Sequence, residues 1–175
     1  MTFSEETRDL PLRGGRLARV RPLRPSDRDL YERAVVDLSP RSRYLRLLAP
    51  IARPSERLLD QMTRPDGYRY MHVAHVALTI DETSDVGVVR YVRSADDPRI
   101  AEVAIAVADD WQGHGLGLRL MRHTAEHARL AGVETTLDEN ARAARLLRAA
   151  GFVPFGGDGG GYAEHRMRLG CWRKT

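Results

Sequence analysis

The sequence DDWQGHGLG, residues 109–117, joins a run of alternating apolar residues to a stretch with helical spacing. The run before it is AEVAIAV (residues 101–107), and LRLMRHTAEHARLAG (residues 118–132) follows it. Alternation of apolar residues predicts a β-strand, and apolar residues three and four apart predict an amphipathic helix. The quoted stretch is therefore predicted to be a strand-to-helix corner that carries glycine at three alternate positions.

Such a corner has the properties of an anion-binding site. Glycine lets the backbone approach a ligand closely, and the first N–H groups of a helix have no partner within the helix. The helix dipole adds positive charge at the same place. The corner lacks the Gly-Lys-Ser/Thr of a Walker A loop, and Leu118 stands where a G-x-G-x-x-G motif needs its third glycine. We expect a phosphate cradle of another kind; a tight turn that binds nothing is the alternative.

Length and composition predict one domain in the cytoplasm. The chain has 175 residues, of which 42% are hydrophobic and 30% are charged, as in an ordinary soluble domain. It has neither an apolar run long enough to span a membrane nor a secretory signal. Cys171 is the single cysteine, so no internal disulfide can form, in agreement with a reducing compartment. We therefore expect no membrane partner.

The net charge of +4 raises the question of nucleic-acid binding. Acidic and basic residues are interspersed along the chain, and no basic run is interleaved with aromatic residues. We therefore expect no nucleic-acid partner.

The order of predicted elements indicates a mixed fold. A strand (residues 16–23) precedes a helix with Ser26 as its N-cap, a short helix (41–48) and a helix capped by Ser55. An antiparallel meander of three strands leads to the quoted corner, and its helix ends at Gly132. A short strand, a helix from Asn140 to a stop at Gly151 and a final hairpin complete the chain. The predicted fold class is α/β (α+β), with a central mixed, mostly antiparallel sheet flanked by helices. Residues 1–15 are expected to be a flexible segment before a single domain of residues 16–175.

The stretch HTAEH contains an H-x-x-E-H metal-binding pattern in His123, Glu126 and His127. It lies inside the helix after the corner, and no third ligand is apparent. His72 and His75 differ by three positions in a predicted strand, so they face opposite sides and cannot chelate together. We therefore expect a polar helix face and no metal.

The segment Gln112–Gly117 fits the Q/R-x-x-G-x-G/A acyl-CoA loop, and with the element order over nearly the entire chain it resembles the GNAT superfamily of N-acetyltransferases. Residues 21–31, 37–48 and 101–117 look like bacterial protein lysine acetyltransferases of the Pat type, which modify acyl-CoA synthetases. The superfamily's N-x-x-A-x-x-L…G-F pattern falls on Asn140, Ala143, Leu146, Gly151 and Phe152. The resemblance implies that residues 16–175 form a GNAT acetyltransferase domain.

The resemblance also implies how acetyl-CoA, the co-substrate, is bound. The main chain of Ile105 and Val107 would pair with the pantetheine arm like an added strand. Asn140 would hydrogen-bond that arm, although a helix N-cap is an equal explanation for an asparagine there. The pyrophosphate would be held by backbone N–H groups of Gln112, Gly113, His114, Gly115, Leu116, Gly117 and Leu118.

Acetyl transfer to an amine requires a base, because an alkylamine with a pKa near 10.4 is almost wholly protonated at pH 7. Glu102 is the candidate. Alternation places it with Ala104 and Ala106 on one face of the strand, where small neighbours leave room for a substrate. From the residues alone, a surface carboxylate paired with an arginine is the simpler interpretation; the resemblance to Pat-type enzymes implies a general base that acts through water.

Two positions depart from the superfamily pattern. Leu147 stands where many members have a tyrosine general acid, so departure of the thiolate would rely on solvent or another group. Pat-type members also lack that tyrosine. The segment from Gly132 to Asn140 is shorter than is usual for the superfamily.

The acceptor stays open between a protein lysine and a small-molecule amine. A catalytically degenerate module that binds acyl-CoA and regulates a partner is the third alternative. We expect direct transfer without a covalent enzyme intermediate, by a monomer or a homodimer.

Overall fold

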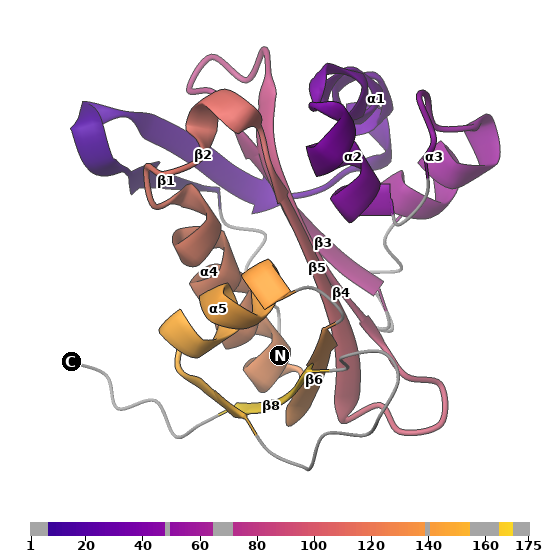
Figure 1. The fold of residues 1–175 in the computed structure, drawn as a ribbon, viewed down its shortest axis with the longest axis vertical. Coiled ribbons are helices and arrows are strands. Elements are labelled where there is room, and N and C mark those ends of the chain that lie inside the picture. The colour runs from indigo at the N-terminus through magenta and orange to yellow at the C-terminus, as the bar shows by residue number, and fades with distance from the viewer. Residues whose placement is uncertain (1–6, 48–49, 65–71, 139–140, 155–164, 170–175) are drawn as a thin grey trace.

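The computed structural model describes residues 7–47, 50–64, 72–138, 141–154 and 165–169. Its centre is a sheet with the strand order β1-β2-β3-β4-β5-β6-β8-β7 (Figure 1). Neighbouring strands are antiparallel except for β5 and β6, which are parallel. The strands are β1 (Arg8–Pro11), β2 (Leu17–Pro22), β3 (His72–Leu78), β4 (Asp85–Arg93), β5 (Ile100–Val107), β6 (Thr135–Asp138), β7 (Phe152–Pro154) and β8 (His165–Leu169). The prediction of a mixed, mostly antiparallel sheet flanked by helices is confirmed.

Helices cover both faces of the sheet. The helices α1, α2 and α3 lie on one face, and α4 and α5 lie together on the other (Figure 1). Their bounds are α1 (Arg28–Asp37), α2 (Pro40–Leu47), α3 (Glu56–Thr63), α4 (Leu116–Leu130) and α5 (Ala141–Ala149). Short 3₁₀ turns are η1 (Arg13–Gly15), η2 (Pro25–Asp27) and η3 (Asp109–Trp111). The strand β5 thus has α4 on one face and α2 on the other.

Hydrophobic clusters on both faces of the sheet hold these layers together. Between the sheet and α4, the side chains of Tyr91, Leu116, Leu120 and Met121 are at most 1% exposed. On the other face, a smaller cluster joins α1, α3 and β4. Complete burial of one such side chain contributes about 1.5–3 kcal/mol, so both helical layers are tightly bound to the sheet.

Residues 1–15 were expected to be flexible, but regular structure begins at residue 8. Arg8–Pro11 forms the edge strand β1, which pairs antiparallel with β2, and η1 makes the turn between them. The short run RDLP has no alternation that predicts a strand. It is extended because it pairs with β2, and a sequence pattern within the run cannot reveal that pairing.

The first helix also begins later than expected. Ser26 is not its N-cap, because residues 25–27 form the 3₁₀ turn η2 and α1 starts at Arg28. The reason is a buried ion pair between Asp27 and Arg21, with Nη1–Oδ2 and Nη2–Oδ1 distances of 2.7 and 2.8 Å. Burial acts to raise the pKa of Asp27, but hydrogen bonds from Arg21 and from the Arg24 N–H outweigh it and lower that pKa. The carboxylate therefore fixes the entry into α1.

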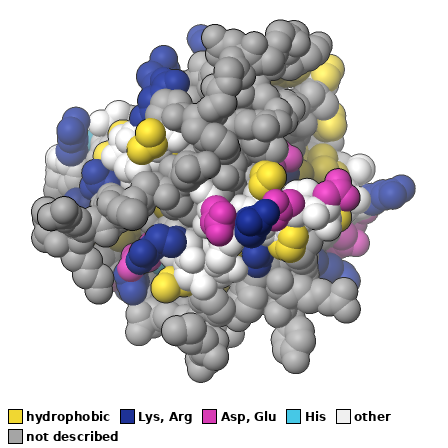
Figure 2. All heavy atoms as spheres, turned by 90° about the horizontal axis from the view of Figure 1, so that it is seen from below, with side chains coloured by type: hydrophobic (Ala, Val, Ile, Leu, Met, Phe, Trp, Pro, Cys, Tyr) yellow, Lys and Arg dark blue, Asp and Glu magenta, His cyan; other side chains and the backbone are white. Residues whose placement is uncertain are grey.

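The surface of the described residues carries both charges. On the face seen in Figure 2, Lys/Arg and Asp/Glu side chains are interspersed among the described residues rather than separated into patches. Within the described ranges, none of the helices combines the length and apolar content needed to cross a bilayer.

Candidate functional site

The corner between β5 and α4 is open at two of its glycines. Gly113 and Gly115 have φ angles of +79° and +90°, in the left-handed region that favours glycine. A Cβ atom built at either position would meet nothing within 4 Å. These two glycines therefore make the turn and leave free space outside it.

Gly117 has a different role. A Cβ atom at this position would lie 3.3 Å from Leu146 Cδ1 and 3.7 Å from Val107 Cγ2. Its absence lets the first turn of α4 pack closely against α5 and the end of β5. The sequence motif therefore combines two glycines that open the turn with one that serves helix packing.

The backbone of this corner has a row of donors without backbone acceptors. The first hydrogen bond at the start of α4 runs from the Arg119 N–H to the Gly115 carbonyl, over 3.2 Å. Within the part of the chain that the structure describes, the N–H groups from Gly113 to Leu118 have no backbone acceptor. The side chain of Leu116 is buried in the core, and that of Leu118 packs against it. The corner thus offers main-chain donors and the positive end of a helix to an anion.

The N-terminal hairpin holds this corner from outside. The Arg13 N–H donates to the His114 carbonyl over 3.1 Å, and Arg16 Nη1 donates to the Asp110 carbonyl over 2.7 Å. The Arg16 guanidinium also lies 5.1 Å from the centre of the Trp111 ring, at a distance typical of cation–π contacts. These contacts with the corner were not predicted from the sequence, because residues 1–15 were expected to be flexible.

The strand β5 has an unpaired edge beyond Glu102. Parallel pairing with β6 covers Ile100, Ala101 and Glu102, whose partners are Thr135, Thr136 and Leu137. In the described residues it extends no further, although β5 continues to Val107. The described pairing of β5 with β6 therefore ends at Glu102, next to the end of β6 at Asp138.

The hydrogen-bond phase of β5 shows which groups face this free edge. The Ala108 N–H donates to the Val86 carbonyl, and the Ser94 N–H donates to the Ile100 carbonyl, so even-numbered residues of β5 bond to β4. The N–H and C=O groups of Ile105 and Val107 consequently point away from β4. Gln112 Nε2 donates to the Val107 carbonyl on that side, over 3.0 Å. Ile105 thus presents both main-chain groups that an added strand would use, and Val107 presents its N–H, because Gln112 already bonds its carbonyl.

Glu102 is the last residue of β5 in the described pairing with β6. Its exposed side chain shares a face with Ala104 and Ala106, which is the face covered by α1, α2 and α3. No Arg or Lys side chain in the described residues forms an ion pair with it. The paired surface carboxylate considered from the sequence is therefore not the arrangement found among those residues.

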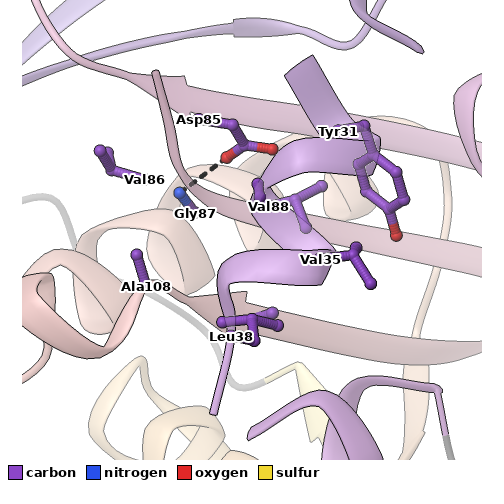
Figure 3. A pocket seen from close by; sticks show the side chains of 10 residues that line it. Tyr31, Val35, Leu38, Asp85, Val86, Gly87, Val88 and Ala108 are labelled. Carbon is purple, nitrogen blue, oxygen red and sulfur yellow. Dashed lines mark hydrogen bonds between the residues drawn. The ribbon is translucent and has the colours of Figure 1, made fainter. Parts of the chain in front are cut away.

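A small cavity lies on the same face, near the other end of β5. It has a volume of about 20 Å³ and lies between α1 and the strands β4 and β5 (Figure 3). Its wall includes Tyr31, Val35 and Ala106. Asp85 also lines the cavity, and its carboxylate accepts the Gly87 N–H over 2.9 Å. This volume accommodates about one water molecule, so the cavity does not enclose an amine substrate.

The histidines of the H-x-x-E-H pattern face the sheet, contrary to the expected polar helix face. The ring centres of His123 and His127 lie 4.5 and 5.2 Å from that of His75 on β3. The Tyr91 hydroxyl is 3.0 Å from His127 Nδ1. His75 is 2% exposed, and its Nδ1 has no hydrogen-bond partner among the described residues. Even so, no group of three or more His, Cys, Asp or Glu side chains in the described residues is arranged to hold a metal ion.

Burial keeps this histidine cluster neutral. Desolvation, followed by the charges of the other two rings, lowers the pKa of His75 well below 6.5. Desolvation and then His123 lower the pKa of His127 to about 4. Desolvation and the charge of Arg8 lower the pKa of His123, against the opposing effect of Glu126. All three rings are therefore harder to protonate in the folded chain than in the unfolded chain.

We expect the free energy of unfolding to be constant with pH just above 6.5 and to fall as pH drops from 6.5 toward 4. In that window the unfolded chain binds protons at these histidines that the folded chain does not, so acid favours unfolding. Urea denaturation across this range measures the effect. His127→Gln, which keeps a hydrogen-bonding partner for Tyr91, is expected to make the fall shallower. Identical slopes for wild type and variant would contradict this assignment.

The remaining predicted site positions lie at the other helix. Asn140 lies outside the described residues, directly before α5. Leu147 is fully buried in the core between α4 and the sheet, so it contributes packing only. The shortened segment after Gly132 still contains β6, which pairs with β5 and β8.

Comparisons with known proteins agree with this geometry. Residues 42–152 match the model of the acetyltransferase (GNAT) family. The chain is 37% identical over 145 residues to Acetyltransferase PA5475 of Pseudomonas aeruginosa, covering 79% of this chain and 76% of that protein.

Solved structures show the same likeness. The GNAT domain of S. lividans PAT superposes with a TM-score of 0.78 and 28% identity, covering 93% of this chain and 95% of that one. The structure of yncA from Salmonella typhimurium, solved with its cofactor acetyl-CoA, superposes with a TM-score of 0.58 and 18% identity, covering 87% and 91%. The latter likeness concerns the fold alone.

Proposed function

The chain belongs to the acetyltransferase (GNAT) family, which uses acetyl-CoA, and from this premise we propose that it transfers an acetyl group directly to a protein lysine. The observation that carries the proposal is one continuous path along β5. It begins at the open corner of residues 113–118, follows the unpaired edge at Val107 and Ile105, and ends at Glu102. Acetyl-CoA binds at the corner end of this path, and the amine proton is removed at the Glu102 end.

The corner holds the pyrophosphate of acetyl-CoA. Its donors are main-chain N–H groups of residues 113–118, and the open space outside Gly113 and Gly115 admits the phosphates. The Gln112 N–H, which was also expected to contribute, already donates to the Asp109 carbonyl over 3.2 Å. The free edge of β5 then pairs with the pantetheine arm. The arm bonds the main chain of Ile105 and Val107 in the way that an additional strand would. The thioester is thereby directed toward Glu102, the last residue of β5 in the described pairing with β6.

Glu102 removes the proton from the acceptor amine, through a water molecule. The neutral amine then attacks the thioester carbonyl, a C–N bond forms and the C–S bond breaks, with CoA leaving as the thiolate and the attacking nitrogen releasing its second proton to solvent. An N–H on the free edge of β5 polarises the carbonyl oxygen as negative charge develops on it. Solvent protonates the thiolate, because Leu147 provides no acid.

Two observations support a protein lysine as the acceptor. The chain resembles the GNAT domain of S. lividans PAT over nearly its whole length. The exposed Glu102 can be reached by a long side chain from a protein surface.

The acceptor class can be tested by measuring lysine acetylation in cells with and without the active protein. We expect a defined set of protein lysines to lose acetylation when Glu102→Gln replaces the wild-type chain. A parallel assay of CoA release with a panel of small amines is expected to show little turnover. Turnover with a small amine and no change in protein acetylation would contradict the lysine proposal. Binding of acetyl-CoA without turnover in either assay would indicate a regulatory module instead.

A further inference from the structure

Asp109 connects the end of β5 with the start of α2. Its Oδ2 accepts the Ser39 N–H over 2.9 Å, and its Oδ1 accepts the Ser42 hydroxyl over 2.7 Å. The same Oδ1 accepts a hydrogen bond from Gln112 Nε2 over 2.9 Å. One carboxylate thus receives donors from two segments that are far apart in the sequence.

On the α2 side, the carboxylate lies at the beginning of the helix. Ser39 caps α2, because its Oγ accepts the Ser42 N–H over 3.3 Å and its carbonyl accepts the Arg43 N–H over 2.9 Å. A negative charge at a helix N-terminus is favourable, so Asp109 stabilises α2 in this position. The helix packs against β5, on the face that carries Glu102.

On the loop side, the network reaches the free edge of β5. Gln112 uses the same amide nitrogen to bond Asp109 and the Val107 carbonyl, over 2.9 and 3.0 Å. The chain of contacts therefore runs from Ser42 through Asp109 and Gln112 to a main-chain group that faces the proposed pantetheine path. A displacement of α2 would move the side chain that bonds this carbonyl.

We propose that Asp109 is a positioning residue that holds the acyl-CoA corner and the acceptor-side helix α2 in one arrangement. This inference rests on the proposed function of the corner. Its consequence is that groups on α2 with no place in the acetyl-CoA path influence acetyl-CoA binding through Asp109. Ser42 is such a group, because its hydroxyl bonds the Asp109 carboxylate.

The test compares a serine in the first turn of α2 with the N-cap serine of the next helix, α3. Ser42→Ala removes the hydroxyl that bonds Asp109 and leaves every group of residues 109–118 in place. Ser55→Ala is the matched control, because Ser55 caps α3 by accepting the Leu58 N–H over 3.3 Å, away from Asp109. Acetyl-CoA affinity is measured by calorimetry, and thermal unfolding is recorded for each variant.

We expect Ser42→Ala to raise the Kd for acetyl-CoA about fivefold, as typical coupling energies between residues of one network imply. Its kcat at saturating acetyl-CoA should stay near that of wild type. Ser55→Ala should lower Tm and leave the Kd unchanged. In an Asp109→Ala background, Ser42→Ala should cause no further change in Kd, because the link is already broken.

Two results would overturn the inference: an unchanged Kd for Ser42→Ala, or a Kd effect that persists in the Asp109→Ala background. The proposed function is tested separately by the wild-type chain in the same titration. If wild type does not bind acetyl-CoA, the proposed function fails before any variant is compared.

Discussion

Glu102→Gln is expected to lower kcat about 1000-fold while the Kd for acetyl-CoA is unchanged, since general base catalysis contributes about 10²–10⁴-fold. Glutamine has nearly the same size as glutamate and cannot accept the amine proton. Glu102 lies on the face opposite α4, and its side chain takes no part in the unpaired edge of β5. Binding and chemistry should therefore separate in this variant.

Two controls sharpen this experiment. Glu126→Gln removes an exposed carboxylate on α4, across the sheet from Glu102, and should leave kcat near the wild-type value. The rate of Glu102→Gln should also rise as pH approaches the pKa of a free alkylamine, near 10.4, because the acceptor then loses its proton without help. Wild-type kcat in Glu102→Gln would exclude Glu102 as the base.

The second large effect is expected at Gly115. Two variants with side chains of nearly equal size separate the effect of charge from the effect of size there. Gly115 has a φ of +90° and open space where a Cβ would point. Aspartate and asparagine are among the residues that best tolerate this backbone region. Gly115→Asp places a carboxylate at the N-terminus of α4, and Gly115→Asn places a neutral amide there.

We expect Gly115→Asp to weaken acetyl-CoA binding on the order of 100-fold relative to Gly115→Asn, because two negative charges about 4 Å apart repel by about 1–4 kcal/mol. The two variants should unfold at similar temperatures, with aspartate favoured slightly by the helix dipole. Calorimetry and thermal unfolding measure both quantities. Equal affinities for the two variants would mean that the phosphates do not lie at this corner.

Much of the fold follows from local patterns. Alternation in residues 101–107 identifies β5 and the face of Glu102, and Ser55 caps α3 as expected. Gly132 and Gly151 end their helices with φ angles of +85° and +96°. These features depend on neighbouring residues in the sequence, which is why sequence patterns predict them.

The features that sequence patterns miss depend on distant residues. Asp109 is 70 positions from Ser39, and Asp110 is 94 positions from Arg16, so local sequence spacing predicts neither contact. The spacing of His123 and His127 places them on one helix face, but nothing local indicates that this face meets His75. For the same reason, Ser26 looks like a helix cap until the pairing of Asp27 with Arg21 is known.

The most direct test of the central claim is a calorimetric titration of the purified chain with acetyl-CoA, supported by thermal unfolding with and without the ligand. The path from the corner at Gly113 and Gly115 to Glu102 predicts saturable binding of one acetyl-CoA per chain and a higher Tm in its presence. Absence of both heat and thermal stabilisation would contradict the account, because it would mean that the fold is retained without a functional acyl-CoA site.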